Sequence, residues 1–301
     1  MTQLENSSLS NQRLIFTDLT VVGVAVVWGS SYVAMQEVGK YLEVQPFLAV
    51  RFLVALPILV YLFNSQLKKI NRKEVGVGLF LGVLLFFILS LETTGVKYTS
   101  AANAGFIIAV SVVLVPLFER IIGGVKKKLS VYIFSFIALF GCFLLSRPTS
   151  SGLGFMLGDY IILGAAFIRG LQIFYFGHFT KKSNVSTTNI TLVELSLVAF
   201  LACTWSFVFS DLEDFGVTSI PFYIWLIVLY LGIIGTSFAF LAQINAAQKT
   251  SSTRVALLLS SEPVFAAFFA WAIANETLSL IQLLGGLLIF VAAFFGRMKE
   301  V

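Results

Sequence analysis

Long apolar runs alternate with short polar connections along almost the whole chain. A transmembrane helix needs about 20 mostly apolar residues to cross roughly 30 Å of hydrocarbon. Ten runs reach this length, and they are continuous, whereas barrel strands alternate over about ten residues. The predicted spans are 19–37, 46–63, 75–95, 100–122, 129–146, 158–179, 190–209, 221–248, 253–275 and 279–296. The pattern predicts an all-α membrane protein with ten transmembrane helices.

The connections between these spans differ in positive charge. Counted together with the two termini, the connections on one side contain fifteen Lys and Arg residues, and those on the other side contain three. Cytoplasmic loops of membrane proteins carry the excess of Lys and Arg. Both termini are therefore predicted to be cytoplasmic. The two remaining arginines, Arg51 and Arg169, lie inside predicted spans.

The composition indicates lipid as the solvent and excludes several functions. The chain is 58% hydrophobic and 12% charged, whereas a soluble domain has about 25% charged residues. One histidine, His178, and two cysteines, Cys142 and Cys203, are too few for a structural zinc site of four ligands. No nucleophile–base arrangement is recognisable either, so the chain is predicted not to be an enzyme and to need no metal or cofactor.

The absence of two kinds of motif argues against nucleic acid and ATP as partners. The chain is basic, with a pI of about 9.2, but it has no basic stripe interleaved with aromatic residues. The cytoplasmic loops account for its positive charge, and no nucleic acid is expected. No glycine-rich segment ends in Gly-Lys-Ser/Thr, the motif with which ATP-driven pumps hold phosphates. An ion gradient or an exchange reaction is therefore the expected driving force.

The chain repeats itself at about half its length. Three pairs of segments correspond, at offsets of 151, 149 and 143: Tyr98–Ala102 with Lys249–Thr253, Leu129–Ser130 with Leu278–Ser279, and Pro46–Arg51 with Asn189–Glu194. Each half holds five predicted spans, so the second half enters the membrane from the opposite side. Inverted repeats are typical of secondary transporters, which bind their substrate near the midplane. The alternative is a duplicated membrane protein that transports nothing.

Short motifs occur in a fixed order along both halves. They are Trp28-Gly29-Ser30-Ser31-Tyr32, Arg51-Phe52, Lys97–Asn103, Glu262–Phe265, Asn275–Ser279 and Gly285–Leu287. With these motifs and the five-plus-five repeat, the sequence resembles the EamA group of the drug/metabolite transporter superfamily over about residues 17–297. The resemblance implies two five-helix repeats, 17–147 and 158–297, in a multi-pass protein of the cell inner membrane. The chain departs from the family at Arg169, where members usually have small or aromatic residues.

The resemblance also implies a function. The chain is expected to be a secondary active transporter that exports amino acids or related small metabolites by alternating access. The alternatives are transport of another small solute, such as a drug, vitamin, nucleobase or sugar, and a non-transporting scaffold, which the lack of a sizeable extramembrane domain disfavours. The expected partners are a small-molecule substrate and membrane lipid. Protons are the candidate coupling ion, and a homodimer is left open.

Polar and charged residues meet near the predicted midplane. At 1.5 Å per residue, Arg169 lies about 16 Å deep and Glu262 about 14 Å deep, and Trp28 and Ser111 reach similar depths. A charge at this depth costs about 2.5–3.5 kcal/mol, so it is expected to face a cavity and a partner. Arg169 could hold a substrate carboxylate with its planar guanidinium group. Glu262 could hold an amine or carry the coupling proton. The alternative is a fixed Arg169–Glu262 ion pair without a role in binding.

Two more residues complete the predicted substrate site. Gln172 lies three residues after Arg169, on the same helix face. Ser31 lies in the same motif as Trp28. Pro263, directly after Glu262, predicts a bend that could aim backbone carbonyl groups at the site, with a packing kink as the alternative.

Three charged residues are candidates for gating or proton coupling. Arg51 and Glu194 are counterparts in the repeat, but they lie in opposite leaflets and are not expected to pair. Arg51 either snorkels to the outer surface or forms an external gate. Glu194 is a candidate for a gate or for proton coupling. Glu92 lies near the outer end of its helix, where an interfacial position is the alternative to a gating role.

Overall fold

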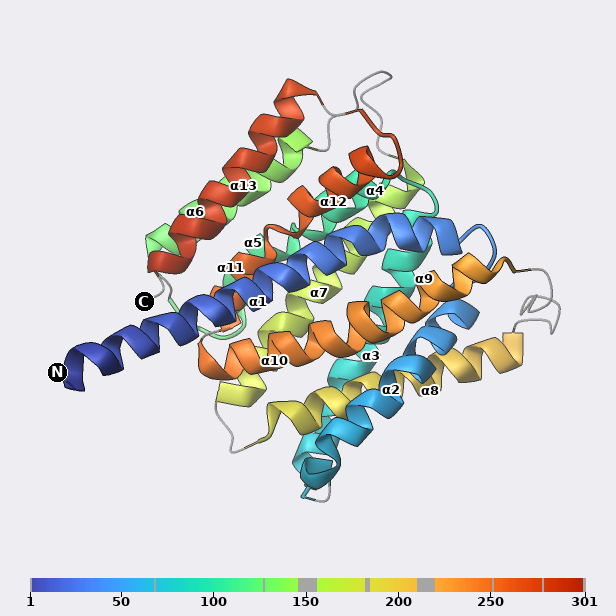
Figure 1. Ribbon diagram of the computed structural model, residues 1–301, viewed down its shortest axis with the longest axis horizontal. Helices are drawn as coiled ribbons and strands as arrows, with labels where there is room; N and C mark the ends of the chain where they lie inside the picture. Colours follow the sequence, from blue (N-terminus) through green and yellow to red (C-terminus); the bar gives the residue numbers. More distant parts are fainter. Residues whose placement is uncertain are drawn as a thin grey trace.

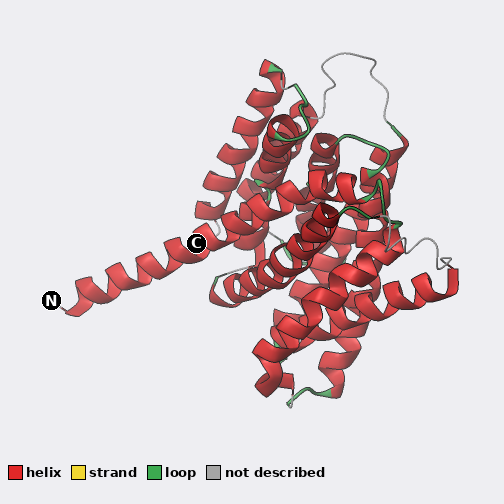
Figure 2. Cartoon of the chain, turned by 45° about the vertical axis from the view of Figure 1, so that its right-hand side comes forward, coloured by secondary structure: helices red, strands yellow, loops and turns green. Residues whose placement is uncertain are grey.

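The computed structural model describes residues 2–67, 69–126, 128–145, 156–181, 185–209, 220–250, 252–277 and 279–299. Within these ranges all regular elements are helices, as Figures 1 and 2 show, and the all-α prediction is confirmed there. The elements are α1 (Thr2–Val38), α2 (Val44–Leu67), α3 (Arg72–Val96), α4 (Ala101–Ile108), α5 (Ser111–Ile121), α6 (Leu129–Leu145), α7 (Leu157–Lys181), α8 (Thr187–Phe209), α9 (Phe222–Gly232), the π-helix η2 (Ile233–Phe238), α10 (Ala239–Lys249), α11 (Ser252–Leu259), α12 (Glu262–Ala272) and α13 (Leu280–Lys299).

Seven helical stretches of the described chain are long and apolar enough to cross a membrane. They are Leu14–Val38, Val44–Asn64, Arg72–Val96, Ala101–Ile121, Leu157–Thr180, Thr187–Phe209 and Phe222–Gln243. The other three predicted spans contain shorter apolar helices, Leu129–Gly141, Glu262–Ala272 and Leu280–Ile289. The protein is therefore a multi-helix membrane protein, whereas the count of ten spans and the cytoplasmic termini stay predictions. The predicted end of the first repeat at 147 lies outside the described residues.

Large apolar side chains cover the outside of the helix bundle. Phe207 is 89% exposed and Tyr61 is 82% exposed, and many leucine and phenylalanine side chains on other helices are also exposed. Burying one such side chain away from water is worth about 1.5–3 kcal/mol, so leaving dozens of them in water would be costly. Contact with lipid explains this surface.

Two membrane helices are broken at corresponding places. α4 ends at Ile108 and α5 begins at Ser111, while α11 ends at Leu259 and α12 begins at Glu262. Each boundary in the first half lies 151 residues before its counterpart in the second half. Pro263 occupies the first turn of α12, where its missing N–H has no helical partner to lose. The bend predicted beside Glu262 is confirmed as a break between two helices.

The same offset continues beyond the breaks. Gly124 and Asn275 follow α5 and α12 by the same distance, and both have the left-handed conformation, with φ values of 65° and 56°. Glycine and asparagine are the residues that tolerate this region best. α6 begins at Leu129 and α13 at Leu280, again 151 residues apart, so the offset of 149 expected for these helix starts is wrong.

The two halves of the chain interleave. α4 packs against α12 and α6 packs against α13, so each of these contacts joins one helix from each half (Figure 1). α1 also packs against α12, while α3 packs against α7 and α8. Figure 1 places α5 and α11 on the side of the two termini, and α4 and α12 on the opposite side.

The crossing of α1 and α12 requires a glycine. A Cβ atom on Gly29 would lie 2.7 Å from the backbone nitrogen of Ala266 and 2.9 Å from the carbonyl oxygen of Glu262. We expect Gly29→Ala to lower the free energy of unfolding by about 1–3 kcal/mol, because backbone atoms on both helices must move. Gly23→Ala is the matched control, because a Cβ there meets nothing within 4 Å and the gain in helix propensity is the same. Thermal unfolding in detergent measures both variants, and equal midpoints would contradict the prediction.

Candidate functional site

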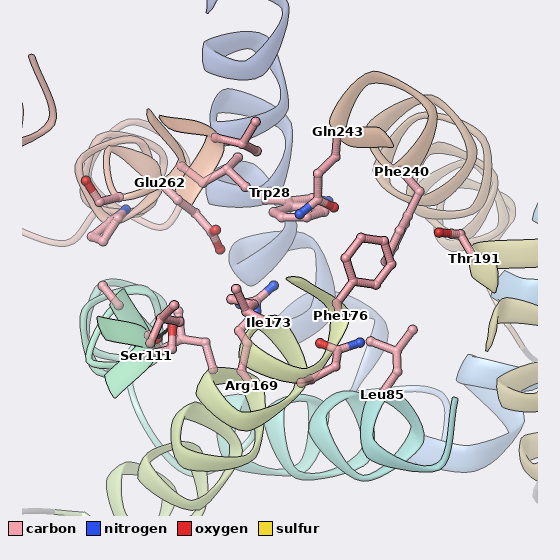
Figure 3. A pocket seen from close by; sticks show the side chains of 18 of the residues that line it. Trp28, Leu85, Ser111, Arg169, Ile173, Phe176, Thr191, Phe240, Gln243 and Glu262 are labelled. Carbon is pink, nitrogen blue, oxygen red and sulfur yellow. Dashed lines mark hydrogen bonds between the residues drawn. The ribbon is translucent and has the colours of Figure 1, made fainter. Parts of the chain in front are cut away.

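A cavity lies beside the two helix breaks (Figure 3). Side chains from α1, α3, α4, α5, α7, α8, α10, α11 and α12 line it, so both halves of the chain contribute. The cavity volume is about 130 Å³. This volume is large enough for several water molecules.

Six of the nine residues predicted to act in binding, gating or coupling line this cavity. They are Trp28, Ser111, Arg169, Gln172, Glu194 and Glu262. Residues that the count along each helix placed at similar depth, such as Trp28 and Glu262, therefore lie around one cavity although more than 200 positions separate them. The structure does not place the other three, Ser31, Arg51 and Glu92, among the described residues that line the cavity.

The helix breaks put two half-helix ends next to the cavity. Ser111 is the first residue of α5 and Glu262 is the first residue of α12. The Ser111 hydroxyl donates to the carbonyl oxygen of Ile108 at 2.8 Å, and the Ser261 hydroxyl donates to that of Leu258 at 2.7 Å. These serine contacts occupy carbonyl groups that the breaks expose. Both half-helices therefore begin at the cavity with their positive dipole ends.

Arg169 faces a carboxylate and an aromatic ring. Its Nη1 atom lies 4.0 Å from Oε2 of Glu92, and its guanidinium carbon lies 5.4 Å from the centre of the Trp28 ring. The ion pair that the structure contains for Arg169 is therefore with Glu92, where sequence reasoning considered Glu262. Glu92 is only 6% exposed, so its carboxylate lies inside the protein, beside Arg169.

Glu262 is held by a residue that sequence reasoning did not single out. The Tyr32 hydroxyl donates to Oε1 of Glu262 at 2.6 Å, and both side chains are buried. Tyr32 also interacts electrostatically with Arg169, so the two acidic residues, the arginine and the tyrosine form one buried network. The signal was available, because Tyr32 follows Trp28 by four residues and shares its helix face.

Glu194 belongs to a separate pair in the same cavity. The Gln172 side-chain amide donates to Oε1 of Glu194, and Glu194 is only 2% exposed. Gln172 lies on α7, one turn after Arg169, and Glu194 lies on α8. The prediction that Gln172 faces the same region as Arg169 agrees with this placement. The cavity therefore contains two carboxylates with different surroundings.

Arg51 lies in the interior instead of reaching the outer surface. It is only 5% exposed, and its Nε donates to the hydroxyl oxygen of Thr236 at 2.9 Å. Its Nη1 lies 3.9 Å from the sulfur of Met35. The prediction that Arg51 snorkels is therefore wrong, because its guanidinium group is buried against the π-helix. Ser31 is also buried, and its hydroxyl donates to the carbonyl oxygen of Val27 at 2.8 Å.

The π-helix η2 connects Arg51 to the cavity wall. The indole nitrogen of Trp28 donates to the carbonyl oxygen of Gly235 at 3.0 Å, and the next residue, Thr236, contacts Arg51. A π-helix turn leaves backbone groups outside the regular ladder, and such turns are frequent at functional sites. Sequence reasoning missed η2, although Gly235-Thr236-Ser237 interrupts an otherwise apolar run.

Comparisons with known proteins agree with this architecture. The model of the EamA-like transporter family matches residues 15–147 and 156–296. An uncharacterized transporter from Archaeoglobus fulgidus is 27% identical, and the match covers 95% of this chain and 87% of that protein. The uncharacterized transporter YoaV of Bacillus subtilis is 24% identical, with coverages of 92% and 94%.

A plant protein and a solved structure are also similar to this chain. A chloroplastic WAT1-related protein from Arabidopsis thaliana is 25% identical, and the match covers 97% of this chain and 72% of that protein. A solved crystal structure superimposes with a TM-score of 0.73, covering 96% of this chain and 99% of the other. At 16% identity, that structure supports the fold alone.

Proposed function

Because the chain belongs to the EamA-like transporter family, we propose that it is a secondary active transporter whose solute binds in the central cavity. The observation that carries this proposal is the placement of Arg169, Glu262 and Glu194 around one cavity between the two halves. Buried charges inside a membrane protein are expensive and usually mark a substrate or ion pathway. We propose amino acids and related metabolites as the solute class, moved out of the cell across the inner membrane.

The proposed mechanism is alternating access by two inverted five-helix repeats, 17–147 and 158–297, in ten spans. The common offset of 151 between α4–α6 and α11–α13 supports the repeat. The cavity is lined by α5 and α11, on the side of the termini, while α4 packs closely on α12 on the opposite side. With cytoplasmic termini, this conformation faces the cytoplasm.

Protons are the proposed coupling ion. Glu194 and Glu262 are buried carboxylates in the cavity wall, and each could exchange a proton when the cavity changes its side of access. Hydrolysis by this chain is not needed, because a proton gradient supplies the energy.

Everted membrane vesicles test this function directly. We expect uptake of at least one labelled solute from a panel of amino acids, amines, organic acids and sugars, because everted vesicles turn export into uptake. A proton ionophore is expected to abolish this uptake. Vesicles without the protein are the control. Sealed vesicles that take up no solute of any charge class would overturn the proposed function, and uptake that withstands the ionophore would contradict proton coupling.

A further inference from the structure

Negative charge exceeds positive charge around the cavity. Glu194 and Glu262 line it, Glu92 forms an ion pair with Arg169, and Arg169 is the arginine among its described lining residues. All three acidic residues are at most 6% exposed. Arg169 interacts with both Glu92 and Glu262, so two carboxylates already share its single positive charge. An additional carboxylate from a solute would meet net negative charge at this position.

Glu194 differs from the other two carboxylates because both of those interact with Arg169, whereas no cationic partner of Glu194 is present among the described residues. Its hydrogen-bond partner among the described residues is the neutral amide of Gln172, which reaches Oε1. No described side chain donates to Oε2. A carboxylate in a water-poor cavity is strongly stabilised by a cation that donates hydrogen bonds. Glu194 thus presents an acceptor to the cavity that a positively charged donor would satisfy.

Two aromatic rings line the same cavity as Glu194. Phe176 follows Gln172 by four residues and shares its face of α7, and Phe240 lies opposite on α10. Figure 3 shows the two side chains close together on one side of the cavity, with Glu262 and Ser111 on the other side. Aromatic faces attract cations by about 0.5–2 kcal/mol. Phe176 therefore lies one helix turn from Gln172, the residue whose amide contacts Glu194, and Phe240 lies beside Phe176.

We propose that the cavity recognises its solute through an ammonium group, which binds Glu194 and packs against Phe176 and Phe240. This inference rests on the proposed function, because it assigns a solute class to the same cavity. An ammonium group occurs both in amines and in zwitterionic amino acids. The charge balance at Arg169 disfavours a solute carboxylate, so among the proposed amino acids and related metabolites an amine binds more tightly than the corresponding amino acid.

A matched set of four compounds separates these cases. Phenylethylamine carries the ammonium group alone, phenylalanine carries ammonium and carboxylate, 3-phenylpropionate carries the carboxylate alone, and 2-phenylethanol is neutral. Isothermal titration calorimetry with the purified full chain in detergent measures each affinity. We expect the order phenylethylamine, phenylalanine, 2-phenylethanol, 3-phenylpropionate, from tightest to weakest.

The variant Glu194→Gln tests the assigned residue. It keeps the size of the side chain and can still hydrogen bond with Gln172, so the fold is retained. We expect the Kd of phenylethylamine to rise at least tenfold and that of 2-phenylethanol to stay within twofold. Glu43→Gln is the matched control, because the Glu43 side chain is 66% exposed and lies outside the cavity, and its affinities are expected to equal those of the unaltered chain.

Two results would overturn the inference. The first is tightest binding of 3-phenylpropionate or 2-phenylethanol, or no binding of phenylethylamine. The second is unchanged phenylethylamine affinity in Glu194→Gln. Neither result touches the proposed function, which depends on the vesicle panel. Tighter binding of phenylalanine than of phenylethylamine would keep Glu194 as the ammonium site but contradict the assignment of amines over amino acids.

Discussion

Replacing Arg169 by Gln is expected to lower the free energy of unfolding by about 3–5 kcal/mol. The substitution leaves Glu92 and Glu262 without their shared cation, and both carboxylates are buried. The ring of Trp28 also loses the guanidinium group that lies over it. Unfolding in mixed micelles with increasing detergent denaturant measures the change. Because an intact network also shapes the cavity, transport in everted vesicles is expected to fall to background.

A second substitution separates charge imbalance from lost packing. We expect Arg169→Gln combined with Glu92→Gln to recover most of the lost stability, because one buried negative charge is removed with the positive one. Arg120→Gln is the matched control, since Arg120 is exposed at the end of α5 and its loss is expected to change stability by less than about 0.5 kcal/mol. Equal stability of Arg169→Gln and Arg120→Gln would contradict the proposed network. A double variant as unstable as Arg169→Gln would instead assign the loss to packing.

Depth along a helix was readable from the sequence, whereas rotation about the helix axis was not. Counting 1.5 Å per residue brought Trp28, Ser111, Arg169 and Glu262 to one level, and all four line the cavity. The same count could not tell that Arg51 points inward to Thr236. Hydropathy alone cannot fix the direction of a single arginine, because apolar residues surround it on every face of its helix.

The sequence also could not show which residues pair with Arg169 and Glu262, because the partners come from other helices. Glu92 is near the end of its predicted span, yet its carboxylate lies beside Arg169. Tyr32 is buried in an apolar run, and its hydroxyl partner lies 230 positions away. The sequence indicated only one of the two helix breaks, because the apolar runs 100–122 and 253–275 are both continuous. Pro263 marked one break, while the other became recognisable through the common offset of 151.

The repeat predicts the contacts of the opposite conformation. On the side away from the termini, a Cβ on Gly105 would lie 2.5 Å from the Cβ of Ala266, so α4 and α12 are closed there. Shifting each position by 151 residues into the other half gives Ala256 on α11 and Val115 on α5. Val115 now lines the cavity. If the two halves exchange their conformations, α5 and α11 approach at Val115 and Ala256 while α4 and α12 separate.

Cysteines at these two positions should therefore trap the alternative state. In a chain whose Cys142 and Cys203 are replaced by Ala, we expect Val115→Cys with Ala256→Cys to react with a short bifunctional thiol reagent that contains a cleavable disulfide. Transport is expected to fall at least tenfold and to return when a reductant cleaves the link, because cycling requires α5 and α11 to separate again. Each single cysteine treated with the same reagent is the control for blocking the cavity. An exchange of conformations brings Val115 and Ala256 together when the side of the termini closes. Two results would therefore exclude it: the two cysteines fail to link in cycling vesicles, or they link and transport is unchanged.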